Sequence, residues 1–382
     1  MAQTSRGKVF VAMSGGVDSS VAALLLQRDG YEVIGVTFKL FTNEDVDLEP
    51  DRPCCSLESV DRARTVCQVL GVPHYTMSFI DQFATDVIDR FVCEYAAGRT
   101  PNPCVLCNRH IKFDGFLRKA LAIGADYIAT GHHARILSPL PAAVCSGMGE
   151  GLGVRESVYH LLPGADPDKD QSYALAHLNQ TIMPRVLLPI GDYTKAQVRE
   201  LATEAALPTA EVAESQDICF VMRGGYGDFL VSRNLVAQPG PIINKDGQVL
   251  GEHRGLEYYT VGQRKSLTIS LGRRLYVIEK RTADNTLVVG DYTDVCRDII
   301  DAEDVNWCDL PAGEWPDTPE TLQVKAMLRY RQQPIPCQIE RHDPKSRTIS
   351  LRLTKPGIAA PGQLLALYDA RDNHVVMGGT IR

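Results

Sequence analysis

The sequence predicts an α/β protein with an N-terminal doubly wound parallel sheet, a small central domain and a C-terminal all-β barrel. Two observations lead to this fold class. Short apolar runs alternate with helical patterns from Lys8 to about Leu207, which implies a parallel sheet covered by helices on both faces. From about Tyr276 the chain has short alternating strands separated by turn residues, which indicates a barrel or sandwich. We therefore predict domains at 1–207, 208–275 and 276–382.

The N-terminal elements follow one another in regular alternation. The expected strands are VFVAM (9–13), YEVIGVTF (31–38), HYTMSF (74–79) and DYIATGHH (126–133). The expected helices are 17–30, 56–71, 83–98 and 113–124. Residues 138–158 form a long irregular insertion or hairpin, and 208–275 show many glycines and no clear period. The expected strands of the last domain are LYVIEK (275–280), TLVVG (286–290), TLQVKAMLRYR (321–331), IPCQIER (335–341), TISLRL (348–353), QLLALYD (363–369) and VVMGGTI (375–381).

Composition narrows the class of protein. Hydrophobic residues make up 44% and charged residues 23% of 382 residues, as in soluble globular proteins. No signal peptide or membrane-length apolar run is present, so we expect a cytoplasmic protein with no membrane partner. Its eleven cysteines are then mostly reduced thiols. The net charge of −7 means that any surface for nucleic acid must be local.

The strongest local signal is AMSGGVDSS, from Ala12 to Ser20. It lies between a buried strand and an amphipathic helix, where parallel-sheet proteins place ligands. Its two glycines allow the backbone to approach a phosphate closely, and the first-turn amides and hydroxyls can donate to phosphate oxygens. The string is neither GxxxxGK[ST] nor GxGxxG.

A second signal is RTPNPCVLCNRHIKF, from Arg99 to Phe113, which places Cys104 and Cys107 three residues apart. Such a pair is compatible with zinc, with an iron–sulfur cluster and with redox chemistry. A disulfide is not expected as the resting state in a reducing cytosol. A structural zinc needs four ligands, and the chain has no second Cys-x-x-Cys.

These motifs carry a family resemblance. SGGVDSS resembles the PP-loop of N-type ATP pyrophosphatases, enzymes that adenylate an oxygen and release pyrophosphate. Further strings, in this order, are similar to those of tRNA-specific 2-thiouridylases over nearly the whole chain: GRTPNPCVLCNRHIKF (98–113), ATGHHAR (129–135), KDQSYAL (169–175), SQDICFV (215–221), EYYTVGQRKSL (257–267) and LRYRQQPIPC (328–337). The resemblance implies a sulfurtransferase that converts the wobble uridine of tRNA to 2-thiouridine with ATP and Mg²⁺.

The resemblance also implies roles for individual residues. ATP would be bound by Ala12, Met13, Ser14, Gly15, Gly16, Val17, Asp18, Ser19, Phe38 and Gly131. The target base and the tRNA would be contacted by Asn102, Pro103, Cys104, His132, Lys169, Asp170, Gln171, Arg329, Tyr330 and Gln363. Cys107 would be the nucleophile, Cys219 would carry a persulfide, and the two would form a transient disulfide. The alternative is a [4Fe–4S] cluster held by Cys104, Cys107 and Cys219, which we disfavour because persulfide chemistry does not require the third thiol.

The chemistry needs these parts because a carbonyl oxygen is a poor leaving group. Adenylation of the uridine O2 makes it part of a departing AMP, and a persulfide is acidic enough to act as the sulfur nucleophile at neutral pH. The sulfur itself comes from a donor protein that the sequence does not identify. Vicinal Cys54 and Cys55 have no assigned role, and near Cys107 the basic residues Arg109, His110 and Lys112 can support a thiolate.

Two basic clusters suggest where the anticodon stem-loop binds. Residues 262–281 hold six basic residues against one acid: Arg264, Lys265, Arg273, Arg274, Lys280 and Arg281, opposed by Glu279. Lys325, Arg329 and Arg331 surround Tyr330, whose ring can stack on a base. Two other classes of function stay open: another PP-loop enzyme, such as an amide-forming synthetase, and a non-enzymatic RNA-binding or sulfur-carrier protein.

Overall fold

The structure is a computed structural model. It describes residues 5–41, 57–138, 158–213, 218–221, 225–233, 235, 237–265, 267, 269 and 274–382. Cys54, Cys55, Arg273 and nearly all of the predicted insertion lie outside the described residues. No helix in the described part of the chain is both long and apolar enough to span a membrane.

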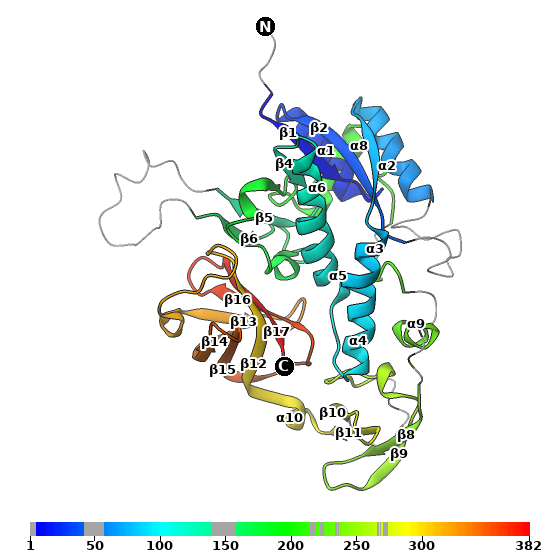
Figure 1. Ribbon diagram of the computed structural model, residues 1–382, viewed down its shortest axis with the longest axis vertical. Helices are drawn as coiled ribbons and strands as arrows, with labels where there is room; N and C mark the ends of the chain where they lie inside the picture. The colour runs from blue at the N-terminus through cyan, green and yellow to red at the C-terminus, as the bar shows by residue number, and fades with distance from the viewer. Residues whose placement is uncertain are drawn as a thin grey trace.

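The N-terminal domain is a five-stranded parallel sheet in the order β3-β2-β1-β4-β7. It occupies the upper part of Figure 1, with the barrel and the small domain below it. Its strands are β1 (Lys8–Ala12), β2 (Glu32–Lys39), β3 (His74–Ser78), β4 (Tyr127–Ala129) and β7 (Val186–Leu187). Successive residues of a strand point to opposite faces. Val9 and Val11 of β1 therefore pack in one core, whereas Phe10 packs in another. The first core lies against α1 (Val17–Arg28), α2 (Leu57–Leu70) and α8 (Lys195–Glu204).

The other face of the sheet is covered by two nearly continuous helical stretches. The first contains α3 (Ile80–Phe83), the π-helix η1 (Ala84–Asp89) and α4 (Arg90–Ala96). The second contains α5 (Pro103–Leu106), the π-helix η2 (Cys107–Gly115) and α6 (Phe116–Ala122). Both cysteines of the Cys-x-x-Cys pair therefore lie on a helix. The short helices η3 (Ser172–Leu175) and η4 (Met183–Arg185) follow later in the chain.

The small domain holds a four-stranded sheet in the order β10-β11-β8-β9. Its elements are α9 (Tyr226–Ser232), β8 (Gly240–Ile243), β9 (Val249–His253), η5 (Leu256–Tyr258), β10 (Tyr276–Arg281) and β11 (Thr286–Gly290). The sequence predicts 276–290 as part of the barrel, because the alternating pattern of a strand does not reveal which sheet the strand joins. Here Leu287 pairs with Ile242, and both side chains are buried in a separate core. The domain boundaries themselves remain predictions.

The C-terminal domain is a closed antiparallel barrel. Its strands are β12 (Cys296–Trp307), β13 (Val324–Met327), β14 (Ile335–Asp343), β15 (Thr348–Ile358), β16 (Leu364–Asp369) and β17 (Val375–Ile381). They follow the order β12-β15-β14-β13-β16-β17, and pairing of β12 with β17 closes the barrel. The short helix η6 (Pro319–Thr321) packs against β14, whereas α10 (Tyr292–Val295), which precedes β12, contacts β10 of the small domain. The predicted fold class is thus confirmed. The acidic strand β12 had no counterpart among the predicted strands.

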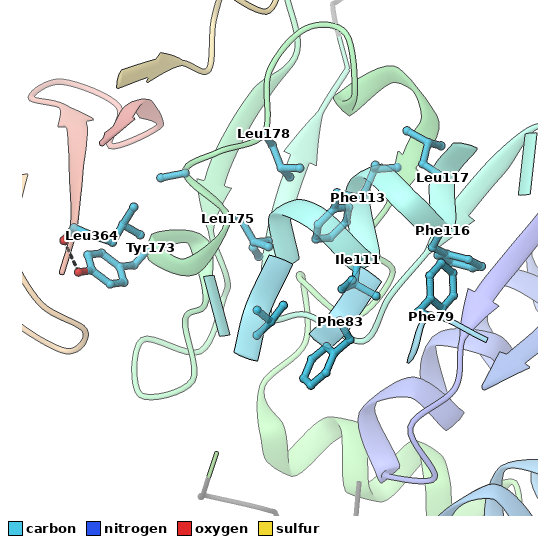
Figure 2. Close-up of a cluster of buried hydrophobic side chains, with 14 of the residues drawn as sticks. Phe79, Phe83, Ile111, Phe113, Phe116, Leu117, Tyr173, Leu175, Leu178 and Leu364 are labelled. Atoms are coloured by element: carbon cyan, nitrogen blue, oxygen red, sulfur yellow. Dashed lines mark hydrogen bonds between the residues drawn. The ribbon is translucent and has the colours of Figure 1, made fainter. Parts of the chain in front are cut away.

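A hairpin from the N-terminal half extends the barrel sheet. It consists of β5 (Ala134–Leu137) and β6 (His160–Pro163), and Leu161 of β6 pairs with Val375 of β17. A continuous core accompanies this junction. It joins Ile111 and Phe116 to Leu175 and to the barrel residue Leu364, whose carbonyl accepts the hydroxyl of Tyr173 (Figure 2). The N-terminal domain and the barrel therefore share one hydrophobic interior.

Replacing Ile111 by Ala should lower the free energy of unfolding by about 2–5 kcal/mol, because the side chain is fully buried and its loss leaves a cavity. Urea-induced unfolding followed by circular dichroism measures this. Ile123→Ala is the matched control, since Ile123 is 59% exposed and should change stability by less than about 0.5 kcal/mol. Equal losses in both variants would contradict a core that runs through η2.

Candidate active site

A pocket of about 310 Å³ opens at the carboxyl ends of the parallel strands. Ligands in parallel α/β sheets bind at this edge. The pocket is built by segments far apart in sequence, and its lining residues are Ala12, Met13, Ser14, Asp18, Ser19, Thr37, Phe38, Leu40, Phe83, Pro103, Cys104, Cys107, Lys112, Thr130, Gly131, His132, Gln171, Ile218, Cys219 and Phe220. Most of the residues that the sequence analysis selected are among them.

The SGGVDSS segment forms a tight turn into α1. Gly15 has a φ of +72°, and a Cβ there would lie 2.4 Å from the carbonyl oxygen of Ser59, so conformation and packing both require glycine. The hydroxyl of Ser19 accepts the amide of Ser14 at 3.2 Å and donates to the carbonyl of Gly16 at 3.1 Å. Gly16 is the N-cap of α1, so the turn lies at a helix N-terminus. A helix N-terminus favours the binding of anions.

Gly131 sits where the chain after β4 crosses the start of α1. A Cβ on Gly131 would lie 2.6 Å from the amide nitrogen of Ser19 and 2.7 Å from the carbonyl carbon of Asp18. No side chain fits at such distances from backbone atoms. Glycine therefore brings this loop into contact with the SGGVDSS turn, and the two together form one wall of the pocket.

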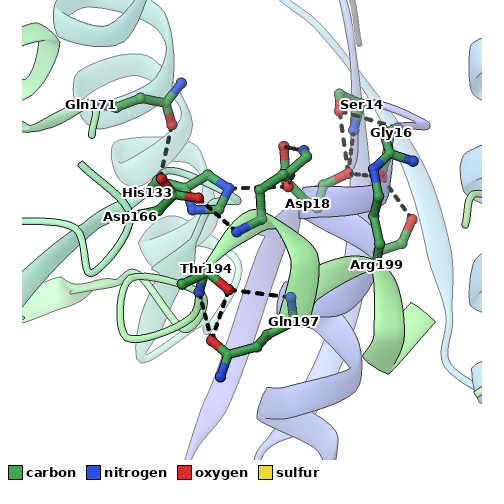
Figure 3. Close-up of polar contacts among 12 residues, drawn as sticks. Ser14, Gly16, Asp18, His133, Asp166, Gln171, Thr194, Gln197 and Arg199 are labelled. Atoms are coloured by element: carbon green, nitrogen blue, oxygen red, sulfur yellow. Dashed lines mark hydrogen bonds and ion pairs between the residues drawn. The ribbon is translucent and has the colours of Figure 1, made fainter. Parts of the chain in front are cut away.

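Asp18 is held by a lysine and a histidine. The Nζ of Lys195 donates to both carboxylate oxygens at 2.7 and 2.8 Å, and Nε2 of His133 lies 3.2 Å from Oδ1 (Figure 3). Burial alone would raise the pKa of Asp18, but the hydrogen bonds from His133 and Lys195 outweigh it and lower the pKa. Asp18 is therefore a carboxylate, and its orientation at the first turn of α1 is fixed.

Lys195 is a site residue that the sequence analysis missed. It is the first residue of α8, whose N-terminus is fixed by a capping box between Thr194 and Gln197. Its backbone amide donates to Asp166 at 2.9 Å, and only 9% of the residue is exposed. The contact with Asp18 spans 177 positions of sequence and depends on the packing of α8 against α1. No local sequence signal could have revealed it.

The Cys-x-x-Cys pair is positioned by a helix start. The side chain of Asn102 accepts the amides of Cys104 and Val105, and Pro103 occupies the first helical position, where its missing N–H costs nothing. Positions three apart lie on the same helix face, so Cys104 and Cys107 both border the pocket. Cys104 is exposed, whereas Cys107 is half-buried.

Cys219 borders the same pocket as Cys104 and Cys107 but comes from a distant part of the chain. It lies in the turn formed by residues 218–221, where the amide of Val221 donates to the carbonyl of Ile218. The neighbouring Phe220 is 1% exposed and packs edge-on against Phe83 and Phe91. Burial of Phe220 anchors the turn and leaves the half-buried Cys219 at the pocket wall.

His132 is a neutral histidine at the back of the pocket. Its Nδ1 lies 2.7 Å from the hydroxyl of Thr130, and its Nε2 lies 3.5 Å from Nζ of Lys112. Burial, and then the charge of Lys112, lower the pKa of His132 far below its usual range. Of the three basic residues close to Cys107 in sequence, Lys112 alone lines the pocket, because Arg109 pairs with the barrel residue Asp304.

The residues expected to contact tRNA are divided among several places. Gln171 lines the pocket and braces His133, whose amide donates to its side chain at 2.8 Å. Asp170 accepts the amides of Gly164 and Ser172 and thus orders its own loop. Asn102 borders a larger cavity of about 570 Å³ between α5 and the barrel.

The remaining residues of that group lie toward the barrel. Arg329 and Gln363 line a third cavity of about 310 Å³, and Gln363 also donates to the carbonyl of Thr100 at 2.6 Å. Tyr330 is 42% exposed, with its ring 6.4 Å from that of Tyr173. Lys169 lies in the loop that precedes η3 and is half-buried.

The first basic cluster is less available to RNA than its composition indicates. Lys280 is enclosed, with its Nζ 5.4 Å from the ring centre of Tyr95, and burial lowers its pKa to about 8. Arg281 pairs with Glu279 at 3.1 Å. The barrel cluster differs, because Arg329, Tyr330 and Arg331 are all exposed. Arg264, Lys265 and Arg274 of the first cluster are exposed as well, so both clusters leave basic surface for a polyanion.

Known proteins match this chain over nearly its whole length. Family models described as a tRNA methyl transferase HUP domain, a tRNA methyl transferase PRC-barrel domain and an aminomethyltransferase beta-barrel domain match residues 7–223, 227–291 and 297–381. The tRNA-specific 2-thiouridylase MnmA of Carboxydothermus hydrogenoformans is 42% identical over 380 residues, 98% of each chain. That of Moorella thermoacetica is 43% identical over 374 residues, 97% of this chain and 98% of the relative.

A solved structure titled as a 4-thiouridine synthetase–RNA complex with bound ATP is also similar. It covers 56% of this chain and 44% of that chain, at 18% identity and a TM-score of 0.33. This likeness is too slight to bear on function.

The parallel sheet and its SGGVDSS turn define an ATP-utilising PP-loop enzyme. Within that class, the full-length identity to curated relatives decides the family. The chain belongs to the tRNA-specific 2-thiouridylases, which are sulfurtransferases. The resemblance seen in the sequence motifs is thereby confirmed.

Replacing Lys195 by Met should destabilise the fold by about 1–2 kcal/mol at pH 7, because the substitution leaves a half-buried carboxylate with one partner fewer. The pKa of Asp18 is lowered in the folded chain. The stabilisation is thus complete above the unfolded pKa of about 3.9 and disappears as pH falls through the folded value.

The difference in unfolding free energy between wild type and Lys195→Met should therefore shrink below about pH 4. Urea titrations between pH 3 and pH 7 measure it. Lys8→Met is the control, since Lys8 and Glu32 form an exposed pair at 3.4 Å worth less than about 1 kcal/mol. A difference that stays constant with pH would show that Asp18 is not the group stabilised by Lys195.

Proposed function

We propose that this chain converts the wobble uridine of tRNA to 2-thiouridine, by adenylation of the uridine O2 followed by sulfur transfer from a persulfide on Cys219. One observation carries the proposal. The SGGVDSS turn, Cys107 and Cys219 come from three separate parts of the chain and border a single pocket of about 310 Å³. An ATP-activated base and a sulfur nucleophile must meet within such a volume for thiolation to occur.

In the first step, the uridine O2 attacks the α-phosphorus of ATP. A bond forms between O2 and phosphorus, and the bond to the β-phosphate oxygen breaks with release of pyrophosphate. The amides of the SGGVDSS turn and the N-terminus of α1 favour the charge that develops on the phosphates. Asp18, kept ionised by Lys195 and His133, is suited to hold Mg²⁺, which would neutralise phosphate charge when bound.

In the second step, the terminal sulfur of the Cys219 persulfide attacks C2 of the adenylated uridine, and AMP leaves with the former O2. Cys107 then attacks the Sγ of Cys219, which releases the thiouridine and leaves a disulfide between Cys107 and Cys219. A cellular thiol reductant restores the two thiols, and the donor protein supplies the next sulfur. Alternatively, Cys107 attacks the persulfide first and frees sulfide as the nucleophile.

Lys112 is suited to support the thiols. His132 is neutral, so Lys112 is the nearby cation that borders the pocket together with Cys107 and Cys219. A positive charge beside a cysteine favours the reactive thiolate form. The same charge would favour the phosphate groups of bound ATP.

The tRNA anticodon stem-loop would lie along the barrel side of the pocket. Arg329 and Tyr330 are exposed on the barrel, and Lys169 lies in the loop that precedes η3, whose Tyr173 ring lies 6.4 Å from that of Tyr330. Cations would contact phosphates, and a tyrosine ring stacks on an unpaired base. Asn102, Pro103 and Cys104, at the start of α5, would border the target base. A cytoplasmic location stays a prediction from the sequence.

A [4Fe–4S] cluster is the competing assignment for the same thiols. Cys104, Cys107 and Cys219 all border the pocket, so three thiolates of the right chemistry are present. When bound, such a cluster would supply an iron position that carries sulfide. We favour the persulfide because sulfur transfer between Cys219 and Cys107 does not need Cys104.

Replacing Cys107 or Cys219 by Ser should lower 2-thiouridine formation more than about 10³-fold, because the covalent sulfur steps are lost. Pyrophosphate release with unmodified tRNA should persist, since adenylation uses no thiol. Mass spectrometry of tRNA nucleosides and a pyrophosphate assay measure the two steps separately. Cys296→Ser, on the barrel, is the control and should retain both. Loss of pyrophosphate release in the Cys107 and Cys219 variants would contradict this division of steps.

Cys104→Ser distinguishes the two sulfur chemistries. If the persulfide operates, the variant purified anaerobically should retain thiolation within about tenfold, and wild-type protein should be active without iron. Elemental analysis and the thiolation assay are the measurements. Stoichiometric iron in wild type, together with loss of iron and activity in Cys104→Ser, would assign the three cysteines to a cluster.

A further inference from the structure

Two histidines and an aspartate meet at the seam between the β5–β6 hairpin and the barrel, outside the pocket. His160 begins β6, Asp309 follows β12, and His374 precedes β17. Nδ1 of His160 lies 3.3 Å from Oδ1 of Asp309, and Nε2 of His374 lies 2.9 Å from Oδ2. One nitrogen or oxygen atom from each residue lies within 4.8 Å of the other two.

Both carboxylate oxygens of Asp309 face a histidine ring nitrogen. Nδ1 of His160 and Oδ1 of Asp309 are shielded from solvent, and the contact between them is a long ion pair with no further hydrogen bond to either atom within the described residues. One such contact satisfies two shielded polar atoms incompletely. Two ligand atoms bound tetrahedrally to zinc at about 2.0–2.1 Å are about 3.3 Å apart. The separation of 3.3 Å between these two atoms suits an ion pair and equally suits two ligands of one metal ion.

A second carboxylate orients one of the histidines. Asp372 contacts Nδ1 of His374 and accepts its backbone amide at 3.1 Å. Metal-binding histidines usually donate their other ring N–H to a carboxylate, which directs the free nitrogen at the metal. The neighbouring set of Asp369, Asp372 and His374 is the weaker candidate, because Asp369 already accepts the amide of Arg371 at 2.7 Å.

We propose that His160, Asp309 and His374 bind a divalent transition-metal ion of the zinc class, with Asp372 orienting His374. Imidazole nitrogens with one carboxylate suit zinc, whereas magnesium and calcium prefer oxygen ligands. His160 is half-buried, so a water molecule can occupy the fourth position. The ion would join the hairpin of the N-terminal half to barrel strands β12 and β17.

Among the described residues, the hairpin itself makes few backbone hydrogen bonds to the barrel, whereas the segment that follows it is bonded to β16 and β12 through Ser172 and Asn179. The ladder between β6 and β17 consists of the single pair Leu161 and Val375. Gln180 adds a bridge, since its side-chain amide donates to the carbonyls of Tyr159 and Cys308 at 2.8 Å. A metal ion held by both sides of the seam would therefore strengthen the attachment of the barrel to the catalytic domain. The proposal is independent of the thiolation chemistry.

Zinc binding to the metal-stripped full-length chain tests the proposal. Dialysis against Zn²⁺ with a competing chromophoric chelator gives stoichiometry and affinity. We expect one ion per chain, bound at least about tenfold more weakly by His374→Gln and by Asp309→Asn. His342→Gln is the matched control, because His342 also faces a carboxylate on the barrel, Glu320 at 3.9 Å, but lies in no such cluster.

Cysteine ligands elsewhere are distinguished with Co²⁺ as the probe. A site of two imidazoles and a carboxylate gives d–d absorption without a sulfur-to-cobalt charge-transfer band, and this absorption should be lost in both variants. Zn²⁺ should raise the melting temperature of wild type and of His342→Gln, and not that of the two site variants. If either site variant fails to fold, His160→Gln replaces it, because His160 is half-buried.

The proposal is overturned by any of three results: no Zn²⁺ bound by wild type, equal affinity in wild type and the site variants, or a cobalt spectrum that comes only from sulfur ligands.

Discussion

The burial of the helical stretch Pro103–Ala122 is the constraint on which the rest of the structure depends. This stretch lies between the parallel sheet and the barrel, and Ile111, Phe113 and Phe116 are fully buried along it. Its start presents Cys104 and Cys107 to the pocket, and Arg109 pairs with Asp304 of the barrel. This helical stretch faces the SGGVDSS turn, the barrel and the turn that carries Cys219. Its displacement would therefore disturb all three.

A second constraint fixes the turn itself. Asp18 is bonded to Lys195 of α8 and to His133 of the loop after β4, and Gln171 in turn braces the backbone of His133. Three segments distant in sequence thus determine the position of one carboxylate. Gly131 allows this approach, since a Cβ there would overlap the start of α1. A preorganised anion site of this kind needs little rearrangement when a charged ligand binds.

The sequence predicted most where local chemistry dominates. Alternation of strands and helices gave the fold class, and the SGGVDSS turn lies at a strand end, where such turns occur. Contacts between distant segments could not be predicted. Lys195 has no local signature, and strands β10 and β11 alternate like barrel strands yet pair with β8. For Cys219, the apolar run ICFVM indicates a buried cysteine, but Phe220 takes the buried position and leaves Cys219 half-exposed.

The two thiols differ in how they are held, and this difference bears on the order of sulfur transfer. Cys107 belongs to a helix buried on both sides, so its position relative to the turn at Ser14 is fixed. Cys219 belongs to a four-residue turn anchored by the buried side chains of Phe220 and Val221. In the proposed mechanism, the cysteine with the persulfide must accept sulfur from a donor protein and then bring it to the base. The cysteine that forms the disulfide afterwards does not have to move. Cys219 would carry the sulfur and Cys107 would form the disulfide in that mechanism, and the way each thiol is held is compatible with these roles.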